Sequence, residues 1–179
     1  MNFTEITRFW FEEIEKVMWF KKDTDFDKAL EDRFLTVHRQ ASACELSEWR
    51  NDPLGTLAEI IILDQFSRNI FRDTPKAFAQ DPLALALAQE AVRRGDDQKL
   101  PAKQRNFIYM PYMHSESAVV HEAAVELFRV NSFDDIYDYE LKHKAIIDRF
   151  GRYPHRNEIL GRKSTPEEIE FLKQPNSSF

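Results

Sequence analysis

The chain has 179 residues, of which 42% are hydrophobic and 31% are charged, and its formal net charge at pH 7 is -6. This size and composition are typical of one globular domain and exclude a chain that is disordered throughout. The negative charge argues against a broad nucleic-acid or anionic-membrane surface, and no apolar run approaches the roughly 18 residues of a membrane span. We therefore expect a single domain, residues 1–179, with no nucleic-acid partner and no membrane partner.

Two further features concern the cellular setting and the chemistry that the chain can support. Residues 1–16 include acidic side chains where a secretory signal needs a basic start and an uninterrupted apolar stretch. Cys44 is the single cysteine, which excludes an internal disulfide and a multi-thiolate zinc site within one chain. The sequence contains neither a P-loop nor a dinucleotide fingerprint. We expect a cytoplasmic protein and predict no metal and no cofactor.

The fold class follows from helix-favouring residues and their spacing. Only four glycines are present, too few for many tight hairpins, while Ala, Leu, Glu, Lys and Arg recur at helical spacing. We predict an all-α fold, an irregular stack of about eight or nine helices in antiparallel pairs. In chain order the predicted helices are 4–20, 24–44, 53–71, 82–94, 102–113, 116–130, 133–149, 155–160 and 166–173. The polar end, residues 174–179, is predicted to be a frayed tail.

Helix starts and ends are marked by residue type. Asp52 and Asp81 each precede a proline, which places a capping acid just before the first helical position. Thr165 begins a capping box at the last predicted helix. Gly95 and Gly151 follow predicted helices, where glycine commonly ends a helix.

The predicted helix 53–71 is apolar on nearly every side, yet it carries polar residues within the stretch LDQFSRNIFR. These residues are Asp64, Gln65, Arg68, Asn69 and Arg72. At 100° per residue Asp64, Arg68 and Arg72 share one face, and the surrounding apolar residues indicate a central, buried helix. An unpaired buried charge costs several kcal/mol, so Arg68 requires a carboxylate, carbonyl groups or a bound anion. Asp64, four residues earlier, is its nearest local partner.

Two interpretations of this polar face stay open. In the first, Asp64, Arg68 and Asn69 form a hydrogen-bonded network that only holds the helices together. In the second, the same groups line a pocket. Two arginines against one aspartate then leave positive charge that suits a carboxylate or a phosphate.

The stretch YMPYMHSES, residues 109–117, contains a proline inside a helical pattern. This proline predicts a kink or a helix end just before His114. His114 is a candidate general acid or base tuned by Glu116, and a purely structural, hydrogen-bonded histidine is the alternative. His121 and Glu122 resemble the start of a zinc-protease motif, but the second histidine of that motif is missing, so we reject a zinc site there.

The stretch DRFGRYPHRNEILGR, residues 148–162, gathers cationic side chains around a glycine and a predicted helix start. Its candidate ligand-binding residues are Arg152, His155, Arg156 and Asn157. Arginines beside the free N–H groups of a helix amino terminus suit an anion. The alternative is a basic loop that ties the carboxyl-terminal helices together through salt bridges.

Three of these stretches, LDQFSRNIFR, PYMHSE and FGRYPHRN, together with FWF at 9–11, closely resemble the signatures of the bacterial domain-of-unknown-function 924 family. The resemblance extends from Phe9 to about Leu172, and three separate motifs in the same order make it specific. It implies an all-helical fold similar to that of tetratricopeptide proteins. It implies no reaction, because the family has no established one.

The leading hypothesis is a helical protein with a concave pocket that binds a small anionic molecule, a carboxylate or a phosphate. The four arginines expected to hold this molecule are Arg68, Arg72, Arg152 and Arg156. Asp64, Asn69 and His155 are expected to orient it, and His114 with Glu116 to perform any acid–base chemistry. The rival hypothesis is a tetratricopeptide-like protein–protein interaction module, in which the polar motifs are structural braces and aromatic residues line a groove for a protein or peptide partner.

Overall fold

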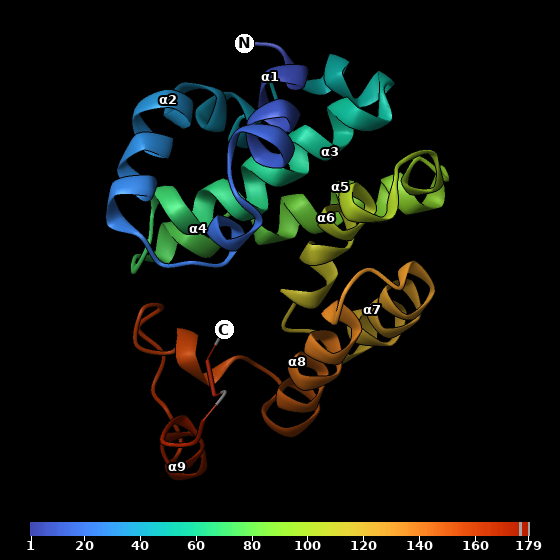
Figure 1. The fold of residues 1–179 in the computed structure, drawn as a ribbon. Coiled ribbons are helices and arrows are strands. Elements are labelled where there is room, and N and C mark those ends of the chain that lie inside the picture. The colour runs from blue at the N-terminus through green and yellow to red at the C-terminus, as the bar shows by residue number, and fades with distance from the viewer. Residues whose placement is uncertain (176, 179) are drawn as a thin grey trace.

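A computed structural model describes residues 1–175 and 177–178, and none of these residues lies in a β-strand (Figure 1). The helices are α1 (Phe3–Arg8), α2 (Thr24–Ser42), α3 (Pro53–Ile61), α4 (Ser67–Ile70), α5 (Asp81–Arg93), α6 (Ala102–Met113), α7 (Ala118–Asn131), α8 (Ile136–Phe150) and α9 (Pro166–Leu172). The predicted all-α class is confirmed. None of the described helices has the length and apolar character needed to cross a bilayer.

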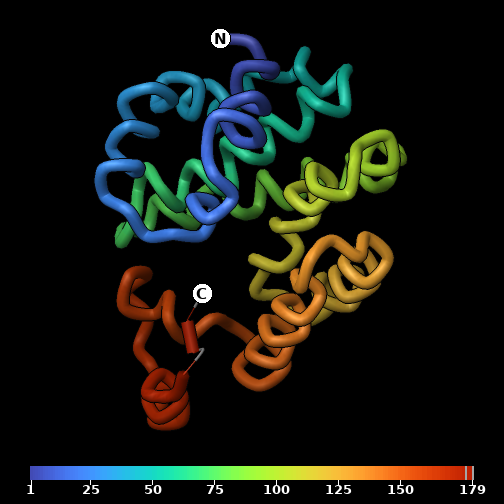
Figure 2. Tube along the Cα trace, in the orientation of Figure 1, coloured from blue at the N-terminus to red at the C-terminus, as the bar shows by residue number. Residues whose placement is uncertain are grey.

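Helices that follow one another in the chain pack against one another. α5 packs on α6, α6 on α7 and α7 on α8, while α3 contacts α1, α5 and α6. In Figures 1 and 2 the amino-terminal half, blue to green, forms the upper part, α7 and α8 lie below it, and α9 lies at the lower left. The predicted irregular stack of helix pairs is confirmed, and its tetratricopeptide-like character stays a prediction.

α3 and α4 are the two ends of one continuous helix, joined by a π-helical turn at Ile62–Phe66. Every residue from 55 to 67 is buried, as the apolar pattern of the predicted helix 53–71 indicated. Gly55 allows close packing at the start of this helix, because a Cβ there would lie 2.1 Å from the carbonyl oxygen of Trp49. This central helix carries the first polar motif into the interior.

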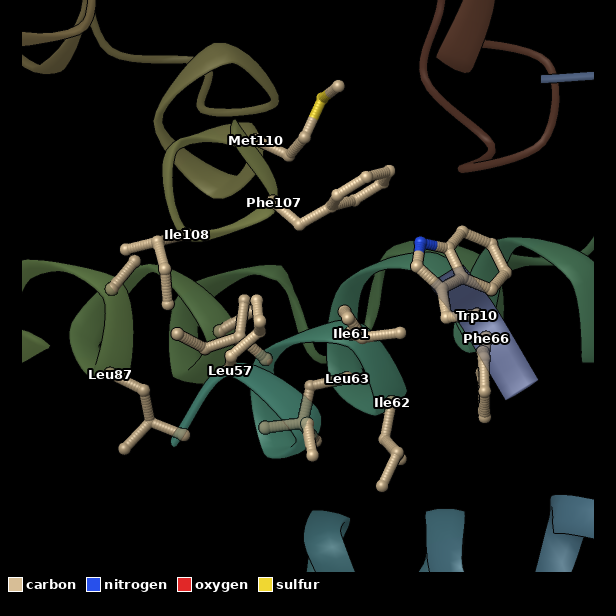
Figure 3. Close-up of a cluster of buried hydrophobic side chains, with 14 of the residues drawn as sticks. Trp10, Leu57, Ile61, Ile62, Leu63, Phe66, Leu87, Phe107, Ile108 and Met110 are labelled. Atoms are coloured by element: carbon tan, nitrogen blue, oxygen red, sulfur yellow. The ribbon is translucent and has the colours of Figure 1, made fainter. Parts of the chain in front are cut away.

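Aromatic rings and branched side chains from several helices surround the central helix. Figure 3 shows Leu57, Ile61 and Phe66 of this helix facing Trp10 and residues of α6. The Trp10 ring lies 5.6 Å from that of Phe66 and 5.7 Å, edge to face, from that of Phe107. Fully burying side chains of this size contributes about 1.5–3 kcal/mol each, so this core is the main source of stability.

The first predicted helix, 4–20, is wrong in its length. Helical structure ends after a π-helical turn at Phe9–Glu13, and a separate 3₁₀ turn follows at Lys16–Trp19. The break lets the Trp19 indole donate to the carbonyl oxygen of Trp10 at 2.9 Å and pack on α6. Burial of this large ring therefore outweighs the local helix propensity.

The structure differs from the sequence prediction at three other boundaries. The predicted helix 155–160 is reduced to a 3₁₀ turn at Pro154–Arg156, because Arg156 and Asn157 are buried and bond to distant groups. Asp81 does not cap α5; Gln80 occupies the cap position, and the Asp81 carboxylate bonds elsewhere. The predicted frayed tail, 174–179, lies partly outside the described residues, and within it Ser177 is buried.

Candidate functional site

The π-helical turn of the central helix sets the direction of the first motif. In this turn the carbonyl oxygens of Leu63 and Asp64 accept side-chain hydrogen bonds from Ser67 Oγ, at 2.6 Å, and Arg68 Nη1, at 2.8 Å. π-Helical turns are rare and occur frequently at functional sites. Asp64 and Arg68 lie four residues apart on one face of the central helix, and Arg68 Nη1 is 3.1 Å from Asp64 Oδ1.

Five charged or titratable residues from the three sequence motifs and α5 form one group, which we call the central cluster: Asp64, Arg68, Asp81, His114 and Arg156. Arg68 bonds to both oxygens of Asp81, at 2.8 and 3.0 Å, and its Nη1 lies 3.1 Å from Asp64 Oδ1. Arg156 donates to Asp81 Oδ2 at 3.2 Å and to the His114 carbonyl oxygen at 3.1 Å. The three motifs therefore meet in space, as the pocket hypothesis requires.

Asp64 is the most deeply buried member of the central cluster, with 1% of its side chain exposed. Burial alone raises a carboxyl pKa, but the nearby charge of Arg68, assisted by His114, outweighs burial and lowers the pKa of Asp64. The Gln65 amide also donates to Asp64 Oδ2 at 2.5 Å. Asp64 is therefore an ionised carboxylate that accepts hydrogen bonds on both oxygens.

One of these hydrogen bonds fixes the His114 ring. His114 Nδ1 lies 2.7 Å from Asp64 Oδ1, and burial, together with the charge of Arg68, lowers the pKa of His114 below its ordinary value. Because Asp64 can only accept, the neutral ring carries its proton on Nδ1. No described residue hydrogen-bonds Nε2, so this nitrogen presents a free lone pair, as a general base requires.

Arg156 is held between two aromatic rings. Its guanidinium carbon lies 4.6 Å from the ring centres of both Phe78 and Tyr153, and 7% of its side chain is exposed. Burial and the like charge of Arg68 lower the pKa of Arg156. Its Nε is buried and has no hydrogen-bond partner among residues 1–175 and 177–178. Of all the arginines in the motifs, Arg156 is thus the least compensated by neighbouring carboxylates.

An open cleft of about 340 Å³ lies beside the central cluster. The cleft is lined by Pro75, Phe78, Ala79, Asp81, Pro82, Leu85, Pro111, His114, Ser115, Glu116, Arg156 and Leu160. Most of these side chains are apolar, and the polar ones come from α5 and from the second and third motifs. An apolar cavity with a few convergent polar groups is the usual form of a small-molecule site.

Two of the predicted site residues, Asn69 and Arg72, bond to α2. Arg72 bonds to both oxygens of Asp27, at 2.5 and 2.8 Å, and the Asn69 amide donates to Asp27 Oδ1 at 2.8 Å. The surplus of positive charge expected on the central helix is therefore compensated by Asp27 and Asp81. This arrangement joins the end of the central helix to α2.

Arg152 and Asn157 bond to α9. Arg152 donates to both oxygens of Glu168, at 2.6 and 2.8 Å, and Asn157 donates to Glu168 Oε2 at 3.3 Å. The hydrogen bond from Arg152 is the largest cause that lowers the pKa of Glu168 to about 2. These contacts match the basic-loop alternative for this part of the third motif.

Glu116 lines the cleft, but its carboxylate bonds to groups other than His114. It accepts from Arg162 Nη1 at 2.6 Å and from the backbone N–H of Tyr153 at 2.7 Å, whereas the carboxylate bonded to His114 is that of Asp64. His155 lies beside the Tyr153 ring, and burial lowers its pKa to about 4.

Sequence reasoning missed several carboxylates that decide this electrostatic pattern. The sequence predicts Asp81 as a helix cap, and Asp27 lies within the predicted helix 24–44 without any distinguishing signal. Glu168 does complete the capping box predicted at Thr165, but it also binds Arg152, which that motif does not indicate. A capping acid next to proline gives no indication of a distant arginine partner. Among the described residues, no group of three or more His, Cys, Asp or Glu side chains is arranged to hold a metal ion.

Comparisons with known proteins support the resemblance carried by the three motifs. The family model for bacterial proteins of unknown function, DUF924, matches residues 6–176. A solved structure of a protein of unknown function from Agrobacterium tumefaciens is 39% identical, with a TM-score of 0.91 over 97% of each chain. A search of curated proteins found no match. The chain belongs to the DUF924 family of bacterial proteins.

Proposed function

We propose that the cleft binds a small molecule bearing a carboxylate or phosphate, that Arg156 anchors this anionic group, and that His114 exchanges a proton with the ligand. The observation that carries the proposal is the His114 ring in the cleft, with Nδ1 fixed by a buried aspartate and Nε2 bonded by no described residue. This pairing of a carboxylate with a neutral imidazole is the arrangement that orients a general base.

Arg156 supplies the reason for expecting an anion. A guanidinium has five N–H donors, and the described contacts of Arg156 use one N–H toward Asp81 and one toward a carbonyl oxygen. Asp81 is shared with Arg68, which also has Asp64 as a partner, so Arg156 has the weaker share of negative charge. A ligand carboxylate or phosphate would complete its coordination in the bidentate geometry that guanidinium favours.

The apolar wall of the cleft constrains the rest of the ligand. Phe78, Pro82, Leu85 and Pro111 line it. We expect a ligand with an apolar body and one anionic end, rather than a highly charged nucleotide, because the cluster as a whole is balanced between carboxylates and arginines.

A thermal-shift screen against metabolite carboxylates, phosphates and nucleotides tests this proposal. A ligand at a hundred times its Kd adds about 2.7 kcal/mol, which raises the Tm of a chain of this size by about 5–10 °C. We expect a carboxylate or simple phosphate to stabilise the wild type, and His114→Gln and Arg156→Lys to lose most of that shift.

Arg72→Lys is the matched control, since it makes the same change in a guanidinium that is paired with Asp27. It should keep the full ligand shift. A ligand shift that survives in both His114→Gln and Arg156→Lys would place the ligand outside the cleft. Absence of any shift would reject anion binding and favour the rival protein-interaction hypothesis, which a crosslinking pull-down then tests.

A further inference from the structure

A second buried pair of titratable groups lies behind the cleft, between α7 and α8. His121 and Glu140 are both completely buried, and His121 Nδ1 lies 2.7 Å from Glu140 Oε1. The other ring nitrogen, Nε2, lies 2.9 Å from the carbonyl oxygen of Ser115. Both nitrogens of one imidazole therefore face oxygen atoms.

The geometry determines how many protons this pair carries. A backbone carbonyl oxygen can only accept, so the contact with Ser115 requires a proton on His121 Nε2. The contact between Nδ1 and Glu140 then requires a second proton, carried either by the ring or by the carboxyl group. The alternative donor to Nε2 is the Tyr153 hydroxyl at 3.2 Å, but its proton is needed for the 2.5 Å contact with the Met113 carbonyl oxygen.

The pair thus holds one more proton than the same two residues hold in an unfolded chain above about pH 7, where glutamate is an anion and histidine is neutral. Two observations agree with this count. Glu140 Oε2 is buried without a hydrogen-bond partner among the described residues, which disfavours a carboxylate anion. Burial is also the largest influence on the pKa of Glu140 and raises it.

Other charged and titratable groups lie near the pair, and the charge of Lys144 lowers the pKa of Glu140 against the larger effect of burial. His143 and Lys144 belong to α8, and Lys144 forms ion pairs with Glu122 and Asp148 at the surface. On its other side the pair faces the carbonyl oxygen of Ser115 and the hydroxyl of Tyr153. Burial, together with the charges of His114 and His121, lowers the pKa of His143. Glu116 interacts with Tyr153, which lies between it and the pair.

We propose that the His121–Glu140 pair controls the cleft through its extra proton. While the pair holds this proton, Ser115 and Tyr153 are fixed in position; when the pair loses it, both residues are free to move. Without that proton, the Nε2 lone pair would face the Ser115 carbonyl oxygen across 2.9 Å, a repulsive contact. The nearest donor, the Tyr153 hydroxyl, would turn to Nε2 and leave the Met113 carbonyl oxygen.

Both released residues belong to the cleft region. Ser115 lines the cleft and follows His114 directly, while Tyr153 stacks on Arg156 and donates its N–H to Glu116. The inference that the pair controls ligand binding rests on the proposed function. The extra proton and the release of Ser115 and Tyr153 do not rest on it. They can be measured without any ligand, so failure of one proposal is distinguishable from failure of the other.

The test is a pH titration by NMR of the wild-type protein, Glu140→Gln and Glu122→Gln. Long-range ¹H–¹⁵N correlations report whether His121 Nε2 carries a proton, and amide signals report on Ser115 and Glu116. At pH 7 we expect a protonated Nε2. As the pH rises, Nε2 should lose its proton with the same midpoint as the amide shifts.

In Glu140→Gln the side-chain amide donates to Nδ1 permanently, so Nε2 stays protonated and the amide shifts disappear. Glu122→Gln removes a surface carboxylate of α7, the helix that carries His121, and should titrate like the wild type. An unprotonated Nε2 at pH 7 in the wild type would contradict the proposal that the pair holds an extra proton. Amide signals that stay constant up to unfolding, or that shift with a different midpoint from Nε2, overturn the control of the cleft. Both decisive measurements use the wild type alone.

Discussion

Replacing Arg68 with alanine tests how much the central cluster stabilises the fold. The Arg68 side chain is 20% exposed, and its partners Asp64 and Asp81 are 1% and 17% exposed. Removing one partner of a buried ion pair costs about 3–5 kcal/mol. Asp64 keeps its hydrogen bond to His114, and Asp81 keeps Arg156, so we expect the lower end of this range, about 3 kcal/mol.

For a chain of this length, about 3 kcal/mol corresponds to a fall in Tm of about 6–12 °C, measured by calorimetry or circular dichroism at pH 7. Arg93→Ala is the control, because Arg93 is 72% exposed and pairs with Glu90 at the surface of α5. That change should cost less than about 1 kcal/mol. Equal melting temperatures for the two variants would refute a stabilising central cluster.

The pH dependence of this difference has a defined sign. The pKa of Asp64 is lowered in the folded state. Its contribution to the free energy of unfolding is therefore fully present above the ordinary pKa of 3.8 and is lost as the pH falls through the pKa of the folded state. The difference in Tm between wild type and Arg68→Ala should therefore be largest near neutral pH and should shrink below about pH 4. A difference that grows in acid would contradict an ionised Asp64.

Two further substitutions, one of them with a control substitution, test the packing of the central helix and the attachment of α9. Gly55→Ala places a Cβ 2.1 Å from the Trp49 backbone oxygen, so we expect a loss of about 3 kcal/mol in denaturant unfolding. Gly95→Ala is the control, because the added Cβ meets no atom within 4 Å and only the φ of +69° opposes it; it should cost about 1 kcal/mol of unfolding free energy. Equal losses of unfolding free energy in the two variants would contradict the clash at Gly55. Glu168→Gln breaks the bidentate contact with Arg152, so amide exchange in α9 should quicken at neutral pH. Because the pKa of Glu168 is lowered to about 2, the amide exchange rates of wild type and variant should converge as the pH falls from about 4.5 toward that value. Equal exchange rates in α9 of wild type and variant at pH 7 would show that the contact does not hold α9.

The motifs identified from the sequence differ in how they are used. In the sequence, charges on an apolar stripe indicate Arg68, a proline before a helix end indicates His114, and a basic turn indicates Arg156. The fold brings these three residues together. Arg72 and Arg152, from the same motifs, bond to α2 and α9 instead. Side-chain type and spacing do not separate these two groups, because the distinction depends on carboxylates 45 and 16 residues away.

Local patterns alone determined the all-α class, the buried central helix and the end of α6 before His114, since helical periodicity and capping act over a few residues. The tertiary structure decided which carboxylate accompanies each arginine. It also decided that Asp64 rather than Glu116 holds His114, and that His121 and Glu140 face each other in the core. These pairings depend on helix packing, because a buried charge or hydrogen-bond donor requires whichever partner the fold places within reach.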